Sequence, residues 1–172
     1  MPQSSRPAHH RILGIDPGSR VTGFGVIENT TKGLRHIDSG CIRLSQDDLW
    51  LRLKMIYDGI TEVIESHKPN IVVVEKVFVS NNANSALILG HARGSAICAA
   101  VNCGVPIVEY TALQVKRAVV GSGGAAKQQV QHMVRALLGL TANPPSDAAD
   151  ALGCAICHLH TSHIEDRLKA AS

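Results

Sequence analysis

Aromatic side chains are scarce in this chain of 172 residues, which contains two Phe, two Tyr and one Trp. A surface that binds single-stranded nucleic acid by stacking successive bases needs a series of aromatic rings, so this class of protein is excluded. The core must be aliphatic instead, and 45% of the residues are hydrophobic. This length suits one domain with a sizeable core and is too short for two ordinary ones.

A disulfide framework and an export signal are also missing. The five cysteines are odd in number and lie in apolar stretches, which indicates reduced thiols in a cytoplasmic protein. No hydrophobic run approaches transmembrane length, and the N-terminus lacks the apolar region of a signal peptide. We expect a disordered tail over residues 1–10, a single domain over 11–163 and a polar C-terminal tail over 164–172.

Positive charge is concentrated in one segment. The net charge is only +3, but residues 76–135 contain six cations against the single carboxylate of Glu109, a net +5 that leaves −2 for the remainder. Such a distribution is compatible with a polyanionic partner. The six cations are Lys76, Arg93, Lys116, Arg117, Lys127 and Arg135.

The hydrophobic pattern predicts alternating strands and helices. Strands are expected near residues 12–15, 21–27, 34–44, 71–74 and 105–108, and helices over 49–63, 82–102, 130–138 and 147–160. The first three strands should form an antiparallel meander, and strands that alternate with helices imply a parallel portion. Pro106 places the last strand at an edge. The sequence thus predicts an α/β fold with a mixed five-stranded sheet flanked by helices.

Four carboxylates occupy suggestive positions. Asp16 and Glu75 each end a predicted strand, while Asp147 and Asp150 lie one turn apart at the start of the last helix. Each has an ordinary explanation, as a turn former, a solvated strand end or helix N-terminal charge. Brought together, they would repel one another unless cations lay between them.

Ligands of oxygen alone favour Mg²⁺ or Mn²⁺. Two such ions, about 3.5–4 Å apart, can catalyse phosphodiester hydrolysis. The four carboxylates therefore predict a metal-dependent nuclease.

Four sequence blocks resemble the RuvC family of Holliday junction resolvases. They are ILGIDPGSRVTGFGV at 12–26, VEKVF at 74–78, QVKRAVVG at 114–121 and SDAADAL at 146–152, within a resemblance that spans about residues 11–160. The resemblance implies a ribonuclease-H-like fold. It also implies a homodimer that nicks two opposed strands of a four-way DNA junction in recombination and repair. The products would carry 5′-phosphate and 3′-hydroxyl ends, and the RuvA and RuvB branch-migration proteins would be partners.

The same resemblance assigns roles to particular residues. Asp16, Glu75, Asp147 and Asp150 would be the catalytic ligands of two Mg²⁺ ions, for which Mn²⁺ could substitute, although some family members have His at the position of Asp150. In addition, DNA contacts are expected at six residues. These are Phe78, Lys76, Arg93, Lys116, Arg117 and Lys127.

Some of these contacts have alternatives. Lys116 and Lys127 match positions near the scissile phosphate, where a cation can offset developing charge, but either could contact the DNA backbone or simply be solvated. Phe78 matches an aromatic residue that meets bases at the junction centre, and its alternative is a buried anchor. Lys76 stands where many relatives have Gln, which leaves Glu75 intact.

Three other interpretations compete. The Cys154–His158 segment satisfies a haem-attachment pattern, but it lies in a predicted core helix, which favours buried thiols. Asp16, Gly18 and Gly23 also resemble the phosphate-binding hairpin of actin-like ATPases, whose second lobe this chain is too short to form. A non-catalytic protein that binds branched DNA would leave four carboxylates beside a polyanion unexplained.

Overall fold

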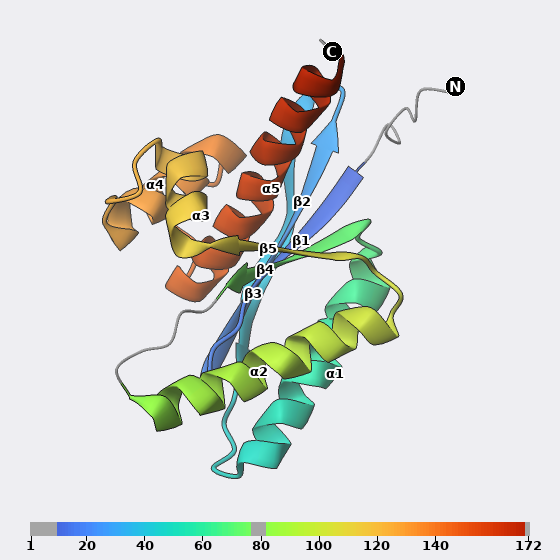
Figure 1. Cartoon of the computed structure of the whole chain (residues 1–172), viewed down its shortest axis with the longest axis vertical. Helices are drawn as coiled ribbons and strands as arrows, with labels where there is room; N and C mark the ends of the chain where they lie inside the picture. The colour runs from blue at the N-terminus through green and yellow to red at the C-terminus, as the bar shows by residue number, and fades with distance from the viewer. Residues whose placement is uncertain (1–9, 77–81, 171–172) are drawn as a thin grey trace.

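A five-stranded sheet with helices on both faces forms the centre of the molecule (Figure 1). This computed structural model describes residues 10–76 and 82–170, with side chains up to residue 164. The elements, in chain order, are β1 (His10–Asp16), β2 (Val21–Thr30), β3 (Gly33–Arg43), α1 (Leu49–His67), β4 (Ile71–Lys76), α2 (Ala83–Asn102), β5 (Ile107–Thr111), α3 (Ala112–Val120), α4 (Lys127–Leu138) and α5 (Ser146–Ala170).

The sheet is mixed, as the sequence predicted. Its order is β3-β2-β1-β4-β5, in which β1 to β3 form an antiparallel meander and β4 is parallel to both β1 and β5. The edge position of β5 is confirmed, but this strand begins at Ile107 and not at residue 105. Pro106 has no N–H to donate, and it contributes only its carbonyl oxygen, which accepts from the Val72 N–H at 2.9 Å.

Two cores lie on the two faces of the sheet. Val72 and Val74 pack in the core under α1 and α2, whereas Val73 points to the core under α3, α4 and α5. All three valines are fully buried, which confirms the prediction of a strand covered on both faces. Figure 1 shows α3, α4 and α5 on one side of the strands and α1 and α2 on the other.

Helix α5 lies unusually close to β1 and β2 because glycines face it. A Cβ added to Gly14 would overlap the backbone carbonyl oxygen of Ala151, so the helix backbone rests directly on the strand. The helix is apolar where it crosses the sheet, and residues 151–157 are all buried. Glycine at position 14 is therefore required by packing and not by backbone conformation.

The structure differs from the sequence-based expectation in its helices. α3 was not predicted, because nine residues give too short a periodic signal; its capping box between Thr111 and Gln114 was the available clue. α5 begins at Ser146 and continues to Ala170, ten residues beyond the expected end, so residues 164–170 form its last turns and not a separate tail. Residues 1–9 of the predicted N-terminal tail lie outside the described residues.

The close contact between α5 and the sheet makes a prediction about two glycines. Gly14→Ala should lower the free energy of unfolding by about 1–3 kcal/mol, as overpacking does, because the new methyl group meets backbone that cannot yield. Gly90→Ala, on the exposed face of α2 with nothing within 4 Å, should raise it by about 0.5–1 kcal/mol. Urea unfolding at equal protein concentration measures both. Equal effects of the two substitutions would contradict the close contact.

Candidate active site

Two of the four predicted carboxylates are brought together by the parallel pairing of β1 and β4. Gly14 pairs with Val73 and Ile15 with Val74, so the next positions in register are Asp16 and Glu75. Both side chains point to the α5 face of the sheet, because they follow Gly14 and Val73 by two residues. Neighbouring strands lie about 4.8 Å apart, which sets the scale of the separation.

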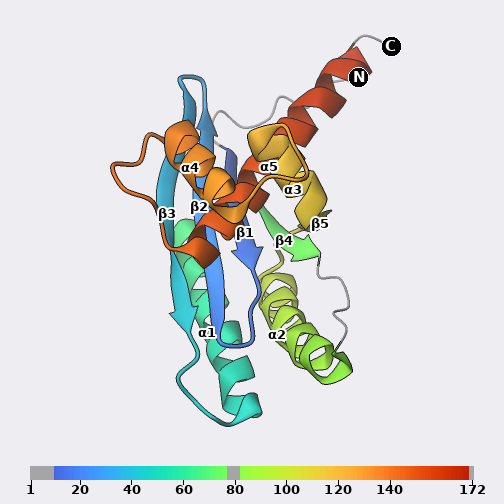
Figure 2. The same ribbon diagram turned by 90° about the vertical axis from the view of Figure 1, so that its left-hand side faces the viewer.

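Helix α5 adds the other two carboxylates from above. Gly23 is the register partner of Asp16 on β2, and a Cβ at Gly23 would overlap the carbonyl oxygen of Asp147. Asp150 lies one helical turn later, on the same side of α5 as Asp147. All four carboxylates thus lie at one end of the sheet. Figure 2 shows the ends of β1 and β4 near the start of α5.

This proximity perturbs the carboxylates. Burial, followed by the charges of Glu75, Asp150 and Asp147, raises the pKa of Asp16 to about 8, with Lys127 acting in the opposite direction. The pKa of Glu75 is also raised, first by burial and then by Asp150. Both groups resist being negatively charged together, and a bound cation would reverse that effect.

Lys127 provides a cation at the edge of this cluster. Its ammonium group lies 2.7 Å from a carboxylate oxygen of Asp150, and the Lys127 side chain is 60% exposed against 20% for Asp150. The hydrogen bond to Asp150 raises the pKa of Lys127, with further contributions from Asp147 and Asp16. Lys127 is therefore positively charged and faces solvent beside the carboxylates.

A small hollow of about 130 Å³ opens between α3, α4, α5 and the end of β4. The charge of Lys116, which lines it, lowers the pKa of Glu75. The family resemblance matches Lys116 and Lys127 to positions near the scissile phosphate, and the structure places both side chains beside Glu75 and Asp150. The hollow is lined by Glu75, Ala112, Val115, Lys116, Lys127, Val130 and Asp150.

The donor set fits a hard divalent cation. The four clustered groups offer only carboxylate oxygens, which suit Mg²⁺ or Mn²⁺. Burial first and the neighbouring carboxylates second raise the pKa of Asp16, and a bound cation would oppose both effects. Within the described part of the chain, no three Asp, Glu, His or Cys side chains are already arranged to hold an ion.

The other predicted DNA contacts are placed differently. Lys76 and Arg117 are exposed, on β4 and α3 respectively. Arg93 on α2 forms an ion pair with Glu109 on β5, on the face of the sheet opposite the carboxylates, so it does not join this site. Phe78 lies outside the described residues.

The haem-attachment pattern is a core feature, as expected. Cys154 and Cys157 are at most 1% exposed, and all five cysteines of the chain are free thiols. Burial raises the pKa of both thiols, to about 11 for Cys157, which makes them unreactive. The His158 Nδ1 atom lies 3.0 Å from the Tyr110 hydroxyl oxygen and so forms a hydrogen bond with another side chain of the chain.

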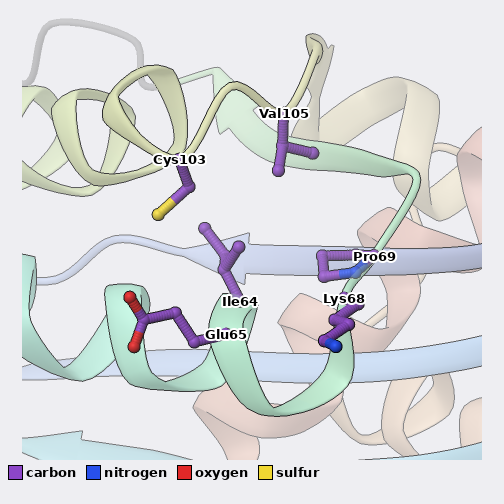
Figure 3. Close-up of a pocket in the computed structure, with 6 residues that line it drawn as sticks. All are labelled: Ile64, Glu65, Lys68, Pro69, Cys103 and Val105. Atoms are coloured by element: carbon purple, nitrogen blue, oxygen red, sulfur yellow. The ribbon is translucent and has the colours of Figure 1, made fainter.

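A larger hollow, of about 510 Å³, lies at the opposite end of the sheet. Ile64, Cys103 and Val105 converge there, beside the start of β4 (Figure 3). Glu65 is the one carboxylate in its lining, so the hollow lacks the clustered acidic groups of the site described above.

Sequence reasoning overlooked two groups on β3 beside the carboxylates. Gly23 pairs with Cys41 and Val21 with Arg43, so both side chains share the α5 face with Asp16. Burial raises the pKa of the Cys41 thiol, and the charges of Asp147 and Asp16 raise it further, which agrees with a position beside the start of α5. Cys41 and Arg43 are two residues apart in the predicted strand, and this spacing already indicated that their side chains share one face of the sheet.

Comparison with known proteins identifies the family. The sequence model of the family described as crossover junction endodeoxyribonuclease RuvC matches residues 12–158. The chain belongs to the RuvC family. The ribonuclease-H-like fold predicted for a RuvC protein is confirmed as well, because the chain superimposes on a solved RuvC structure from Thermus thermophilus with a TM-score of 0.81.

Individual RuvC proteins are similar over most of their length. The crossover junction endodeoxyribonuclease RuvC of Azoarcus sp. (strain BH72) is 57% identical over 160 residues, which cover 93% of this chain and 87% of the relative. The Thermus structure is 36% identical and covers 90% of this chain and 96% of its own. A second Thermus RuvC structure, in complex with Holliday junction substrate, has a TM-score of 0.80 at 33% identity, with the same coverage.

The raised pKa of Asp16 predicts a pH-dependent stability when divalent metal is chelated. Between pH 3.8 and about 8 the folded protein keeps a proton that the unfolded chain releases, so stability should fall as pH rises through this window. The Asp16→Asn variant has no titratable carboxyl group at this position, so its stability should fall less over the same range. Urea unfolding in EDTA at a series of pH values compares the two proteins. Parallel curves would contradict the clustered geometry.

Proposed function

We propose that this RuvC family member resolves four-way DNA junctions by metal-dependent hydrolysis of phosphodiester bonds. The observation that supports this most directly is the convergence of Asp16, Glu75, Asp147 and Asp150 at one end of the sheet, in a chain of this family. The Thermus relative whose complex contains Holliday junction substrate supports the choice of DNA structure.

The four carboxylates are proposed as ligands of two Mg²⁺ ions, with Mn²⁺ as a possible substitute. Bound Mg²⁺ would supply an activated water, hold the scissile phosphate and stabilise the leaving 3′ oxygen, which gives 5′-phosphate and 3′-hydroxyl ends. Asp16 is the central ligand in this proposal, because its pKa is affected by all three of the other carboxylates. Glu75 lies next to it on β4, while Asp147 and Asp150 approach from α5.

Lys127 and Lys116 are proposed to act on the phosphate and the ligands. Lys127 holds the Asp150 carboxylate at 2.7 Å and remains largely exposed, so its ammonium group can orient that ligand and meet a phosphate oxygen. Lys116 lines the same hollow as Glu75. Fixed cations beside the reacting phosphate offset the charge that develops in the transition state.

The wider DNA surface and the partners are also proposals. Lys76 and Arg117 are exposed and are proposed to contact phosphates, and Phe78 to contact bases at the junction centre. Arg93 contributes less directly, because it is paired with Glu109. Resolution of a four-way junction needs two opposed nicks, which supports a homodimer. RuvA and RuvB are proposed partners.

A cytoplasmic location agrees with a DNA substrate and with five free thiols. No helix in the described residues is long and apolar enough to cross a membrane.

The match to the RuvC family disfavours both the ATPase and the non-catalytic DNA-binding alternatives.

The central test is cleavage of a synthetic four-way junction in Mg²⁺. Asp16→Asn should reduce the rate by at least about two to three orders of magnitude, the scale for loss of one group that stabilises transition-state charge. Binding in Ca²⁺ should survive. Asp58→Asn, at a side chain that is 56% exposed in a surface pair with Lys54, is the matched control and should cleave normally.

The rate and the position of the nicks are read from denaturing gels. Cleavage by Asp16→Asn at the wild-type rate would contradict the proposed site. Junction binding by the wild-type protein without any nick in Mg²⁺ or Mn²⁺ would contradict the proposed activity.

A further inference from the structure

A buried carboxylate holds two arginines together at the end of the sheet opposite the active site. Glu28 is 3% exposed, and its two carboxylate oxygens accept from Arg11 at 2.9 Å and from Arg35 at 2.7 Å. These residues are neighbours on β1, β2 and β3, because Glu28 is the register partner of both arginines. The hydrogen bond from Arg11, reinforced by the one from Arg35, lowers the pKa of Glu28 against the effect of burial. Arg11 precedes Asp16 by five residues, which is about 17 Å along β1.

The two arginines keep donors for a further anion. A guanidinium group carries an N–H donor on every nitrogen. Arg11 donates from a terminal nitrogen to the carbonyl oxygen of His67 at 2.8 Å, which anchors it to the end of α1. Arg35 is 63% exposed, so the donors that it does not use for Glu28 are accessible to a ligand. A charged hollow of about 500 Å³ lies here, lined by Arg11, Glu28, Arg35, Lys68 and Asn70.

Lys68 completes the charged hollow from a strained backbone position. It follows the last residue of α1 with a φ of 47°, and it is the one residue other than glycine with a positive φ among residues 10–76 and 82–170. Glycine is the usual residue there, because a Cβ is unfavourable at such a φ. A lysine in the last turn of α1 would complement the helix dipole without this strain.

The side chain of Lys68 has no partner to account for that strain. It is exposed, and within the part of the chain that the structure describes no carboxylate forms an ion pair with its ammonium group. Backbone strain is commonly retained where a side chain serves a binding function. Lys68 and the two arginines therefore suit an anion from outside the chain.

An apolar hollow adjoins the charged one, and Lys68 lines both. This apolar hollow is the one of about 510 Å³ into which Ile64, Cys103 and Val105 converge. Figure 3 shows Lys68 at one side of it and Glu65 at the other, where a second acidic group would be repelled. The two hollows together fit a carboxylate beside an apolar side chain. A DNA backbone offers phosphates but no apolar group to fill the second hollow.

We propose that the charged and apolar hollows form a docking site for a partner protein, which inserts a segment with an acidic residue next to an apolar one. The carboxylate binds Arg35 and Lys68 through charge-assisted hydrogen bonds. The apolar side chain packs against Ile64 and Val105, and its burial contributes to affinity. Because the site is at the other end of the sheet, a bound partner leaves the active site open to DNA. This inference goes beyond the proposed function and does not depend on it.

The test is a peptide titration of the full-length protein, followed by the NMR shifts of its backbone amides. The probes are the acetylated and amidated peptides Asp-Asp-Leu-Leu and Leu-Leu-Asp-Asp, which cover both chain directions. At least one should bind saturably and shift amides in both hollows. Replacement of its Asp residues by Asn, or of its Leu residues by Ser, should weaken binding by about tenfold, because each change removes one half of the recognition.

Two variants and a matched control assign the binding to these side chains. Arg35→Gln should weaken binding of the peptide by about tenfold, the scale for loss of a charge-assisted hydrogen bond. Lys68→Gly should weaken it similarly while its melting temperature is at least that of the wild-type protein, because glycine relieves the positive φ. Lys54→Gln removes a cation that is 69% exposed in a surface pair with Asp58, and it should leave binding unchanged.

Several results would overturn the proposal. One is the absence of a saturable shift with either peptide at millimolar concentration, and another is equal binding of the Asn peptides. A reduced salt dependence of junction binding in Arg35→Gln and Lys68→Gly would assign the cations to DNA phosphates instead. A changed oligomeric state of these variants in sedimentation would assign the hollows to a second copy of the chain. Both variants should cleave a four-way junction at the wild-type rate, so this proposal and the proposed function fail separately.

Discussion

The close contact between α5 and the strands β1 and β2 is the constraint on which the rest of the structure depends. Glycines at positions 14 and 23 leave no side chain between the strands and the helix, so the carbonyl oxygens of Ala151 and Asp147 rest on the sheet. Any larger residue at either position would lift the helix. The buried apolar stretch 151–157 then stabilises α5 in this position, and the active-site end of the helix follows from that packing.

This packing forces like charges together. Burial and the neighbouring carboxylates raise the pKa of Asp16 to about 8, which is an electrostatic cost that the folded protein bears at neutral pH. The hydrophobic contacts of α5 offset that cost, while Lys127 relieves part of it through Asp150. Such a site favours cation binding, because the carboxylates repel one another but each is attracted to a divalent ion bound between them. Stability and the proposed activity therefore make opposite demands on the same four side chains.

The sheet also separates the face that carries the four carboxylates from the face that α1 and α2 cover. α3 and α4 bring Lys116 and Lys127 to the face that carries the carboxylates, and β3 brings Arg43 to the same face. On the other face, Arg93 is paired with Glu109 and the helices α1 and α2 cover an aliphatic core. Alternation along each strand decides which layer a residue joins, so that Glu75 and Val74, adjacent in sequence, serve different faces.

The sequence by itself determined the sheet, most of the helices, the four carboxylates and the family, because strand and helix periodicity and short motifs are local properties that survive without tertiary contacts. It did not predict α3, whose nine residues give little periodic signal, or the full length of α5. It grouped Arg93 with the other cations, whereas the structure pairs Arg93 with Glu109 on the opposite face and places Arg43 on the carboxylate face, since charge along a chain does not say which face of a sheet a side chain occupies. Only the tertiary structure decided those matters, because the register between strands and the close approach of α5 over Gly14 and Gly23 bring together residues more than a hundred positions apart.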